Sequence, residues 1–300
     1  MKAIIGWIYC ILALATTPLA AQQAPDGGPG YVLPETETWE LAPEKGGEPY
    51  FIMVSRPTGS PPDEGFPVLY VLDGNAYFAA FAEARRVLAG ELTNPFARPG
   101  IGNSIVVGVG YPATEWPFDV RRLYDFTPPM MDNPTPYQAR LAKFPSGGQD
   151  EFISFLVDRL RPELARRYSI DPHRQALFGH SLGGLFALHV LYTRPGAFSA
   201  LIAASPAQAW NQQAILAEER EFAGRLSQGK IEGPVSRILL LAGEDEEHYA
   251  LLADAAALAR RLQALSGYGL RSAFQELDNE VHVTVPSRSV TMTLHFAFTK

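Results

Sequence analysis

The chain has 300 residues, of which 47% are hydrophobic and 19% charged, and its formal net charge is −7. This composition is that of an ordinary globular protein and excludes a disordered or collagen-like chain. The acidic balance argues against nucleic acid or an anionic membrane surface as the main partner.

The first 21 residues have the pattern of a secretory signal. A single cation, Lys2, precedes an apolar stretch, and small residues follow it up to Ala20 and Ala21. The apolar stretch is shorter than the roughly 20 residues that a membrane span needs, although an uncleaved N-terminal anchor stays open as an alternative. Residues 1–21 are therefore predicted to be a signal peptide of a periplasmic or secreted protein that has no stable membrane association after cleavage.

The single cysteine, Cys10, lies inside this signal. The mature chain is therefore expected to have no disulfide, no thiolate metal site and no cysteine nucleophile. Residues 22–35, rich in Pro and Gly at their start, are predicted to be a flexible leader. Residues 36–300 are predicted to form one domain, which is long enough to bury most of its apolar surface in a single core.

From residue 36 onward, short apolar runs alternate with helical patterns. Residues 37–41 and 50–55 are predicted to pair as antiparallel strands, because their link is too short for a helical crossover. Further strands are expected at 68–72, 104–109, 176–178, 200–204, 237–242 and 271–277, and helices at 76–88, 150–168, 182–192, 249–266 and from 286 onward. This alternation predicts a mostly parallel sheet that is covered by helices on both faces.

A long segment, residues 111–148, lies between a strand and a helix that a few residues could join. Its aromatic and basic residues are Tyr111, Trp116, Phe118, Arg121, Arg122, Tyr124, Phe126, Arg140 and Lys143. We interpret the segment as a wall or lid over a functional site, although packing within the segment explains the aromatic residues equally well. For Arg121 and Arg122 the alternatives are solvated surface or ion pairs with Asp119 or Asp125.

The pentapeptide Gly179-His180-Ser181-Leu182-Gly183 lies between a predicted strand and a predicted helix. In this context G-x-S-x-G is typical of a nucleophile elbow, a sharp strained turn that lifts the serine hydroxyl out of the sheet. We expect side chains two positions before and after the serine to collide, which explains both glycines. Ser181 is the predicted nucleophile, and the fold is predicted to be an α/β-hydrolase fold with a lid-like insertion.

The general base is sought among six histidines. In an α/β-hydrolase the catalytic groups lie at the carboxyl ends of the strands and follow the order Ser, acid, His. His282 lies just after the last predicted strand, in a polar loop, where the base belongs. His248 is a weaker competitor. The remaining four are interpreted as surface or core residues: His173, His180, His189 and His295.

The acid is expected just after the strand at 237–242. There Gly243 is followed by three candidate carboxylates, Glu244, Asp245 and Glu246. Each alone is better explained by a solvated charge run. Glu246, three residues past Gly243, is the preferred candidate for holding the histidine tautomer, and Asp245 is the next.

An oxyanion hole needs two N–H donors. One is expected from the amide of Leu182, directly after the nucleophile. The other is expected in the loop Asp73-Gly74-Asn75 after the strand at 68–72, where Gly74 permits close backbone approach. Asn75 is the alternative donor and is also expected to contact the substrate. D-G-N is also an ordinary turn sequence, but its position after the strand favours the functional interpretation.

Seven stretches occur in the order found in the putative-esterase family of α/β-hydrolases, which includes esterase D: LYVLDGNAYF, IVVGVGYP, RRLYDFTPP, GGQDEF, GHSLGGL, ASPAQAW and NEVHVTVP. The sequence resembles most closely the periplasmic siderophore (enterobactin-type trilactone) esterases of that family, over nearly the whole mature chain. The resemblance implies a serine esterase that needs no metal or cofactor. It also implies roles for Ser181, His282, Glu246, Gly74 and Leu182 as assigned above.

The resemblance further implies a small-molecule ester as substrate, one that is anionic and catechol-bearing or otherwise carries a bulky aryl group. Arg122 heads the R-x-x-D-F-T-P stretch and is expected to grip an oxyanion of this substrate in two places. Trp210 stands after the Ser-Pro pair, where many members carry two tryptophans and this chain carries Ala209 and Trp210. Both are expected substrate contacts.

Other functions on the same scaffold stay open. A non-catalytic binding protein would be expected to lose Ser181 or His282, and both are present. An acyltransferase or thioesterase would use the same triad, so the sequence does not separate these from an ester hydrolase. Product analysis with a competing alcohol would do so. The sequence carries no signal for the oligomeric state.

Overall fold

The computed structural model describes residues 31–89, 97–112, 116–132 and 134–299. The predicted signal peptide and most of the predicted leader lie outside these residues. From Leu33 onward the chain forms one compact unit.

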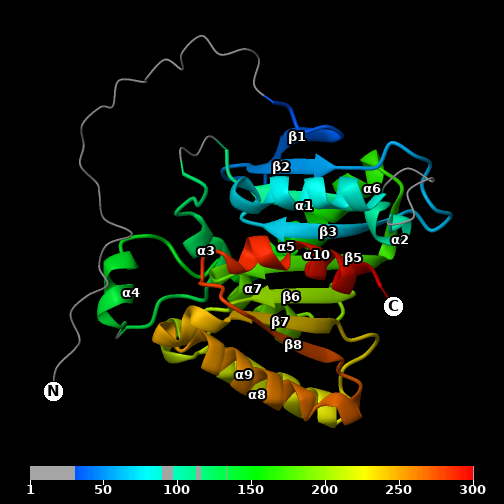
Figure 1. Ribbon diagram of the computed structural model, residues 1–300. Coiled ribbons are helices and arrows are strands. Elements are labelled where there is room, and N and C mark those ends of the chain that lie inside the picture. Colours follow the sequence, from blue (N-terminus) through cyan, green and yellow to red (C-terminus); the bar gives the residue numbers. More distant parts are fainter. Residues whose placement is uncertain (1–30, 90–96, 113–115, 133, 300) are drawn as a thin grey trace, which may run out of the picture. The chain divides into compact units, whose positions relative to one another are not determined.

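Eight strands form a single sheet (Figure 1). They are β1 (Thr36–Leu41), β2 (Tyr50–Ser55), β3 (Phe66–Leu72), β4 (Ile105–Gly110), β5 (Ile170–His180), β6 (Ala200–Ala204), β7 (Arg237–Gly243) and β8 (Ser272–Leu277). Their spatial order is β1-β2-β4-β3-β5-β6-β7-β8. β2 is antiparallel to β1 and β4, and all the other neighbours are parallel. The predicted strands are all present, and the predicted mostly parallel sheet with an initial antiparallel pair is confirmed.

The central strands explain this arrangement. Every residue of β3, β4 and β6 is buried, as expected for parallel strands that are covered on both faces. The edge strands β1 and β8 have several exposed positions instead. The apolar runs of the sequence therefore mark the middle of the sheet.

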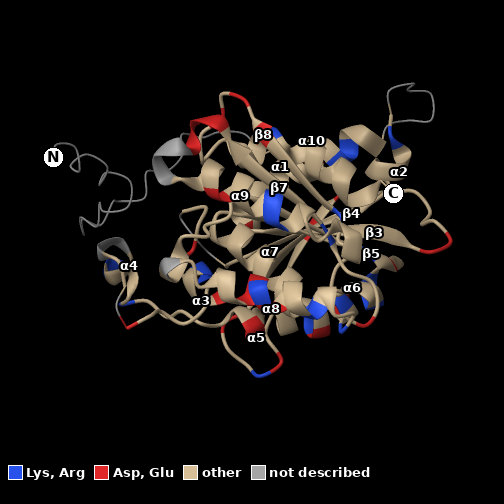
Figure 2. Ribbon diagram, turned by 90° about the horizontal axis from the view of Figure 1, so that it is seen from below, with Lys and Arg blue, Asp and Glu red and all other residues tan. Residues whose placement is uncertain are grey.

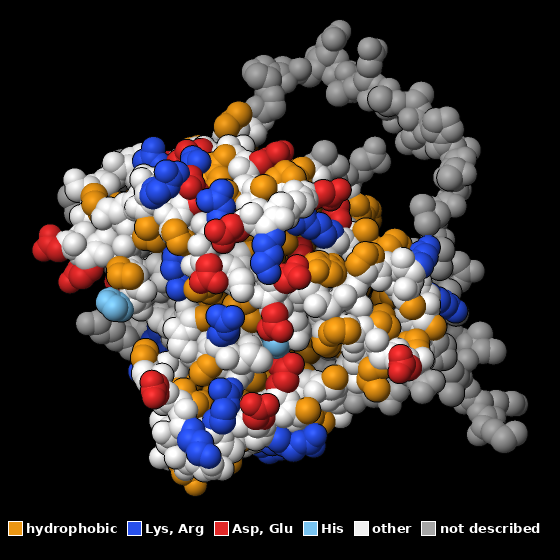
Figure 3. Space-filling view, turned by 180° about the vertical axis from the view of Figure 1, so that it is seen from behind, with side chains coloured by type: hydrophobic (Ala, Val, Ile, Leu, Met, Phe, Trp, Pro, Cys, Tyr) orange, Lys and Arg blue, Asp and Glu red, His pale blue; other side chains and the backbone are white. Residues whose placement is uncertain are grey.

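Helices cover both faces of the sheet (Figure 2). The sheet separates two buried apolar clusters. One face carries α1 (Gly74–Ala89), α2 (Pro99–Gly102) and α10 (Val285–Phe298). The other carries α3 (Arg122–Phe126), α5 (Gln149–Ser154), α6 (Arg161–Arg167), α7 (Leu182–Thr193), α8 (Ile215–Ser227) and α9 (Leu251–Gln263). On the face seen in Figure 3, basic and acidic side chains are interspersed. Arg261 of α9 pairs with Glu219 of α8 at 2.5 Å.

The structure differs from the sequence prediction in three helical regions. The helix expected at 150–168 is interrupted between α5 and α6 by a π-helical turn, Phe155–Leu160. Pro162, which has no N–H to donate, follows this turn and accounts for the broken hydrogen-bond ladder. α8 was not predicted. The segment 111–148, for which no helix was predicted, contains α3 and α4 (Pro136–Leu141), which are too short to show a helical period.

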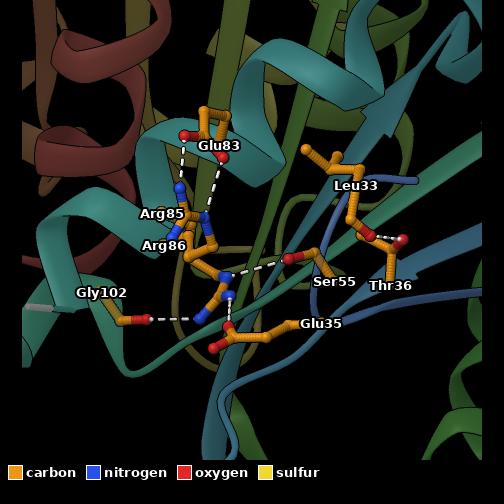
Figure 4. A network of polar contacts seen from close by, with 8 residues as sticks. All are labelled: Leu33, Glu35, Thr36, Ser55, Glu83, Arg85, Arg86 and Gly102. Atoms are coloured by element: carbon orange, nitrogen blue, oxygen red, sulfur yellow. Dashed lines mark hydrogen bonds and ion pairs between the residues drawn. The ribbon is translucent and has the colours of Figure 1, made fainter. Parts of the chain in front are cut away.

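A buried arginine joins helix α1 to the sheet and to α2 (Figure 4). The side chain of Arg85 is fully buried, donates to Ser55 Oγ at 3.0 Å and to the Gly102 carbonyl at 3.2 Å, and pairs with Glu35. Burial lowers the pKa of Arg85, and the Glu35 carboxylate offsets part of that effect. These contacts join α1 to β2 and α2 at the amino end of β4. Among the described residues, no helix combines the length and the apolar character that crossing a membrane requires.

Candidate active site

Ser181 lies in a sharp turn between the end of β5 and the start of α7. Its φ of 57° and ψ of −113° are rare for a residue other than glycine. The Ser181 amide donates to the Ala204 carbonyl at 2.9 Å, and the Ser181 carbonyl accepts from Leu185 and Ala207 at 3.0 and 3.1 Å. Neighbouring strand and helix therefore hold the strained turn that the pentapeptide indicates.

The glycines of this turn are not equivalent. A Cβ on Gly179 would overlap the backbone of Gly183, so Gly179 has no room for a side chain. A Cβ on Gly183 would make only ordinary contacts, the nearest 3.6 Å from Leu72. The prediction of a collision at both positions is thus right for Gly179 and wrong for Gly183. The second crowded position is Gly184, where a Cβ would lie 2.9 Å from the Ala204 carbonyl oxygen.

His282 lies in the loop between β8 and α10. Its Nδ1 is 2.6 Å from Glu246 Oε1. Because a carboxylate only accepts hydrogen bonds, Nδ1 carries the proton, and in the neutral imidazole Nε2 then has a free lone pair. Of the three candidate carboxylates, Glu246 is the one that reaches His282 and is buried, whereas Glu244 and Asp245 are exposed.

Two further groups fix the Glu246 carboxylate. Oε2 accepts from the Gly243 amide at 2.7 Å and from Ser205 Oγ at 2.8 Å. Ser205 has a φ of 42° and directly follows β6. Sequence reasoning missed Ser205, although its position at the carboxyl end of a parallel strand was a usable signal. The acid is therefore held by three donors from three different segments.

A second histidine lies beside the expected base. His180 directly precedes Ser181, and its ring centroid is 4.5 Å from that of His282. Within the described structure the Ser181 hydroxyl makes no hydrogen bond to His282. A nucleophile and its base commonly close this contact only when substrate is bound. The structure thus brings Ser181, His282 and Glu246 to one edge of the sheet.

His180 is held neutral by its surroundings. Burial is the main cause that lowers the pKa of His180 well below its ordinary value, and the neighbouring His282 acts in the same direction. Its Nδ1 lies 3.0 Å from the hydroxyl of Tyr77. Tyr77 packs edge-on against Phe118, with ring centroids 5.8 Å apart, and Phe118 is 37% exposed. Sequence reasoning assigned no role to His180 or Tyr77.

The two expected oxyanion donors begin two helices. The Asp73 carbonyl accepts from Ala76 and Tyr77 at 2.9 and 3.2 Å, so the amide of Gly74 precedes the first bonded turn of α1. Leu182 is likewise the first residue of α7. Because β3 and β5 are parallel neighbours, both helix N-termini lie at the same edge of the sheet as Ser181.

The three expected substrate contacts lie differently from one another. The Asn75 side chain donates to the Tyr111 carbonyl at 3.0 Å and accepts from the Tyr111 amide at 2.8 Å. Arg122 donates two hydrogen bonds to the Asp73 carboxylate, at 2.8 and 2.9 Å, so its fork already has a partner within the protein. Trp210 is 6% exposed and packs in the apolar cluster on the α7 face. All three side chains are thus engaged or buried within the protein.

The neighbouring Arg121 belongs to a separate network. Its Nη1 donates to the Pro49 carbonyl at 3.0 Å, and its Nε is 3.8 Å from Asp125 Oδ2. Asp125 is buried and accepts from the hydroxyls of Tyr50 and Tyr111 at 2.8 and 2.9 Å. Burial raises the pKa of Asp125 to about 6, although these donors counteract part of the effect. The expected alternative of an ion pair with Asp125 thus holds for Arg121.

Two surface hollows of about 260 and 410 Å³ lie beside Arg121, with Glu48 and Asp119 in the lining of both. Neither is lined by Ser181 or His282. In the part of the chain that the structure describes, no group of three His, Cys, Asp or Glu residues is placed to hold a metal ion.

Comparisons with known proteins identify relatives of this chain. The family model described as Putative esterase matches residues 44–269. Ferri-bacillibactin esterase BesA of Bacillus subtilis is 37% identical over 270 residues, which cover 89% of this chain and 91% of the relative. A siderophore enterobactin esterase of Emericella nidulans is 39% identical over 193 residues, 61% of each chain. The crystal structure of the BES protein from Bacillus cereus superposes with a TM-score of 0.79 and 33% identity, covering 92% of this chain and all of that one.

Proposed function

This chain belongs to the Putative esterase family of α/β-hydrolases and is an ester hydrolase, and from that premise we propose that it cleaves carboxylic esters through Ser181, His282 and Glu246. The observation that carries the proposal is the 2.6 Å contact between His282 Nδ1 and the buried Glu246. In the neutral imidazole this contact places the proton on Nδ1, so that the lone pair of Nε2 can act as a general base.

In the proposed mechanism, Ser181 Oγ attacks the ester carbonyl while His282 Nε2 takes its proton. The carbonyl oxygen becomes an oxyanion that the amides of Gly74 and Leu182 stabilise. The tetrahedral intermediate then collapses, the bond to the alkoxide breaks, and His282 returns the proton to the leaving alcohol. Water, deprotonated by His282, attacks the acyl-enzyme and releases the acid and free Ser181.

For the substrate, we propose a siderophore ester, with an enterobactin-type trilactone as the first candidate. Support comes from the relatives that are named as siderophore esterases. The half-exposed ring of Phe118, two contacts away from His180, offers an aromatic surface near the serine. We also place the enzyme outside the cytoplasm, as the expected signal at residues 1–21 implies. N-terminal sequencing of the mature chain checks that placement.

The test is a substrate panel assayed with wild type and Ser181→Ala: the trilactone, a feruloyl ester, short acyl esters and an acyl thioester. Removal of the nucleophile should lower kcat by roughly 10⁴-fold or more on every ester that wild type cleaves, with an unchanged unfolding transition. Wild-type activity in Ser181→Ala would contradict the proposed mechanism. A trilactone rate no higher than that of simple acetate esters would reject the siderophore substrate and leave the esterase mechanism standing.

A further inference from the structure

A buried ion pair joins the segment 111–148 to the loop before α1. Arg122, the first residue of α3, donates from Nε to Asp73 Oδ1 at 2.8 Å and from Nη2 to Oδ2 at 2.9 Å. The Asp73 side chain is fully buried, and that of Arg122 is 15% exposed. Two parallel charge-assisted hydrogen bonds are both strong and directional. The pair therefore fixes the β3–α1 loop to α3.

The Asp73 carboxylate lies beside the proposed oxyanion hole. Asp73 directly precedes Gly74, and its Oδ2 would be 3.8 Å from a Cβ on Gly183, the second residue of α7. The carboxylate is thus close to the N-terminal turns of both α1 and α7, whose first amides are the proposed donors. An unpaired negative charge at this place would repel the oxyanion that forms on the substrate.

Arg122 is itself held in place. Its guanidinium lies over the rings of Phe118 and Phe126, 5.4 and 5.5 Å from their centroids. Burial lowers the pKa of Arg122, but the Asp73 carboxylate more than compensates, so that this pKa lies above its ordinary value. The guanidinium is therefore a permanent, fixed positive charge opposite Asp73.

We propose that Arg122 is a positioning residue of the esterase site, which neutralises Asp73 and holds Gly74 in place to receive the oxyanion. The inference rests on the proposed hydrolysis at Ser181. It replaces the expectation that Arg122 grips an anionic substrate, since both prongs of its fork are taken by Asp73. Arg122 then acts on the transition state of any ester, neutral or anionic.

The test uses Arg122→Gln, Asp73→Asn and the double variant, assayed on a neutral short acyl ester and on an anionic aryl ester. Residue 73 has a φ of 52°, a conformation that asparagine tolerates as well as aspartate does, so Asp73→Asn keeps the backbone. In Arg122→Gln, kcat should fall about 10²-fold on both esters, comparable to the loss of one oxyanion-hole donor, with KM within about twofold. The double variant should recover at least about tenfold of that loss, because no bare carboxylate remains.

A second readout reports the oxyanion hole directly. A boronic acid, which forms a negatively charged tetrahedral adduct on the serine, should bind Arg122→Gln weaker by about the factor lost in kcat. Arg122→Lys keeps the charge and should stay within about tenfold of wild type, which also covers the case in which Arg122→Gln does not fold. The matched control is Arg121→Gln, whose contacts are with Pro49 and Asp125; its kcat should stay within about twofold of wild type.

Three results would overturn the proposal. An unchanged kcat of Arg122→Gln on the neutral ester, with a raised KM on the anionic ester alone, would make Arg122 a substrate contact. A double variant slower than Arg122→Gln would make the pair a purely structural clamp. Equal losses in Arg121→Gln would assign the effect to the segment as a whole. Ser181→Ala assayed in parallel separates these outcomes from a failure of the esterase mechanism, since only the latter leaves that variant active.

Discussion

Two buried polar networks, one at each end of the parallel strands, differ in whether they are closed. At the carboxyl end, Glu246 is fully buried but its partner His282 is 30% exposed, so one face of the network is open to a substrate. At the amino end of β4, the donors of Arg85 are directed to Ser55, Gly102 and Glu35 inside the protein. A closed network stabilises the fold, whereas an open network leaves a group free to react.

Topology explains why the open network lies where it does. The chain leaves each parallel strand at the same edge of the sheet, so loops that are distant in sequence meet there. Asp73 follows β3, Ser181 follows β5, Ser205 follows β6 and Glu246 comes three residues after β7. A single edge thus collects the nucleophile, the acid and the two helix N-termini without any long-range pattern in the sequence.

Substitutions of the base and the acid test the open network and should have the largest effect on kcat. His282→Ala should lower kcat by roughly 10⁴-fold or more, because no other group takes the serine proton. Glu246→Gln should keep a kcat at least about tenfold higher than that of His282→Ala, since the acid orients the imidazole and does not transfer the proton. Steady-state kinetics on an activated ester measure both.

The matched control is Asp245→Asn, which changes an exposed neighbour of Glu246 and should leave kcat within about twofold of wild type. A larger loss in Asp245→Asn than in Glu246→Gln would move the acid by one residue. It would also mean that the buried Glu246 network is not the one that reacts.

The second prediction tests the closed network. Arg85→Met should reduce the free energy of unfolding by about 3–5 kcal/mol, because it leaves buried acceptors and Glu35 without their cation. Urea unfolding measures this loss, and kcat of the folded enzyme should stay within about twofold. The control is Arg56→Met, whose exposed pair with Glu37 should contribute under about 1 kcal/mol. A fall in kcat at unchanged stability would contradict the assignment.

Local pattern was enough to predict much of the fold. The predicted bounds 50–55 and 200–204 coincide with β2 and β6, because β-branched and apolar residues end there at turn residues. The same edge rule that located Ser181 also pointed to the loops of His282 and Glu246. These predictions needed only the order of elements and the places where they end.

What the sequence did not reveal depends on contacts across the chain. The Asp73–Arg122 pair spans 49 positions, and nothing in either local stretch names the other partner. Ser205 gains its hydrogen bond to Glu246 only when β6 and β7 lie side by side. Trp210 is predicted to contact a substrate; its side chain lies buried in the apolar cluster, and the local stretch does not show that burial.

Asp125 tests whether the role of a buried carboxylate is set by its position in the fold or by the closure of its network. It lies near the carboxyl end of β4, but the hydroxyls of Tyr50 and Tyr111 close its network. Burial raises the pKa of Asp125 to about 6, above its ordinary value of about 4. Between these values the folded state keeps a proton that the unfolded chain releases, so the free energy of unfolding falls as pH rises from about 4 to 7, by about 2 kcal/mol from this group. Asp125→Asn should lose that part of the slope, measured by urea unfolding at both pH values, whereas the exposed Asp158→Asn should keep it. Because the network is closed, kcat of Asp125→Asn on a neutral ester should stay within about twofold of wild type; a large loss of kcat with an unchanged slope would mean that position at the carboxyl edge, and not closure, sets the role of a buried carboxylate here.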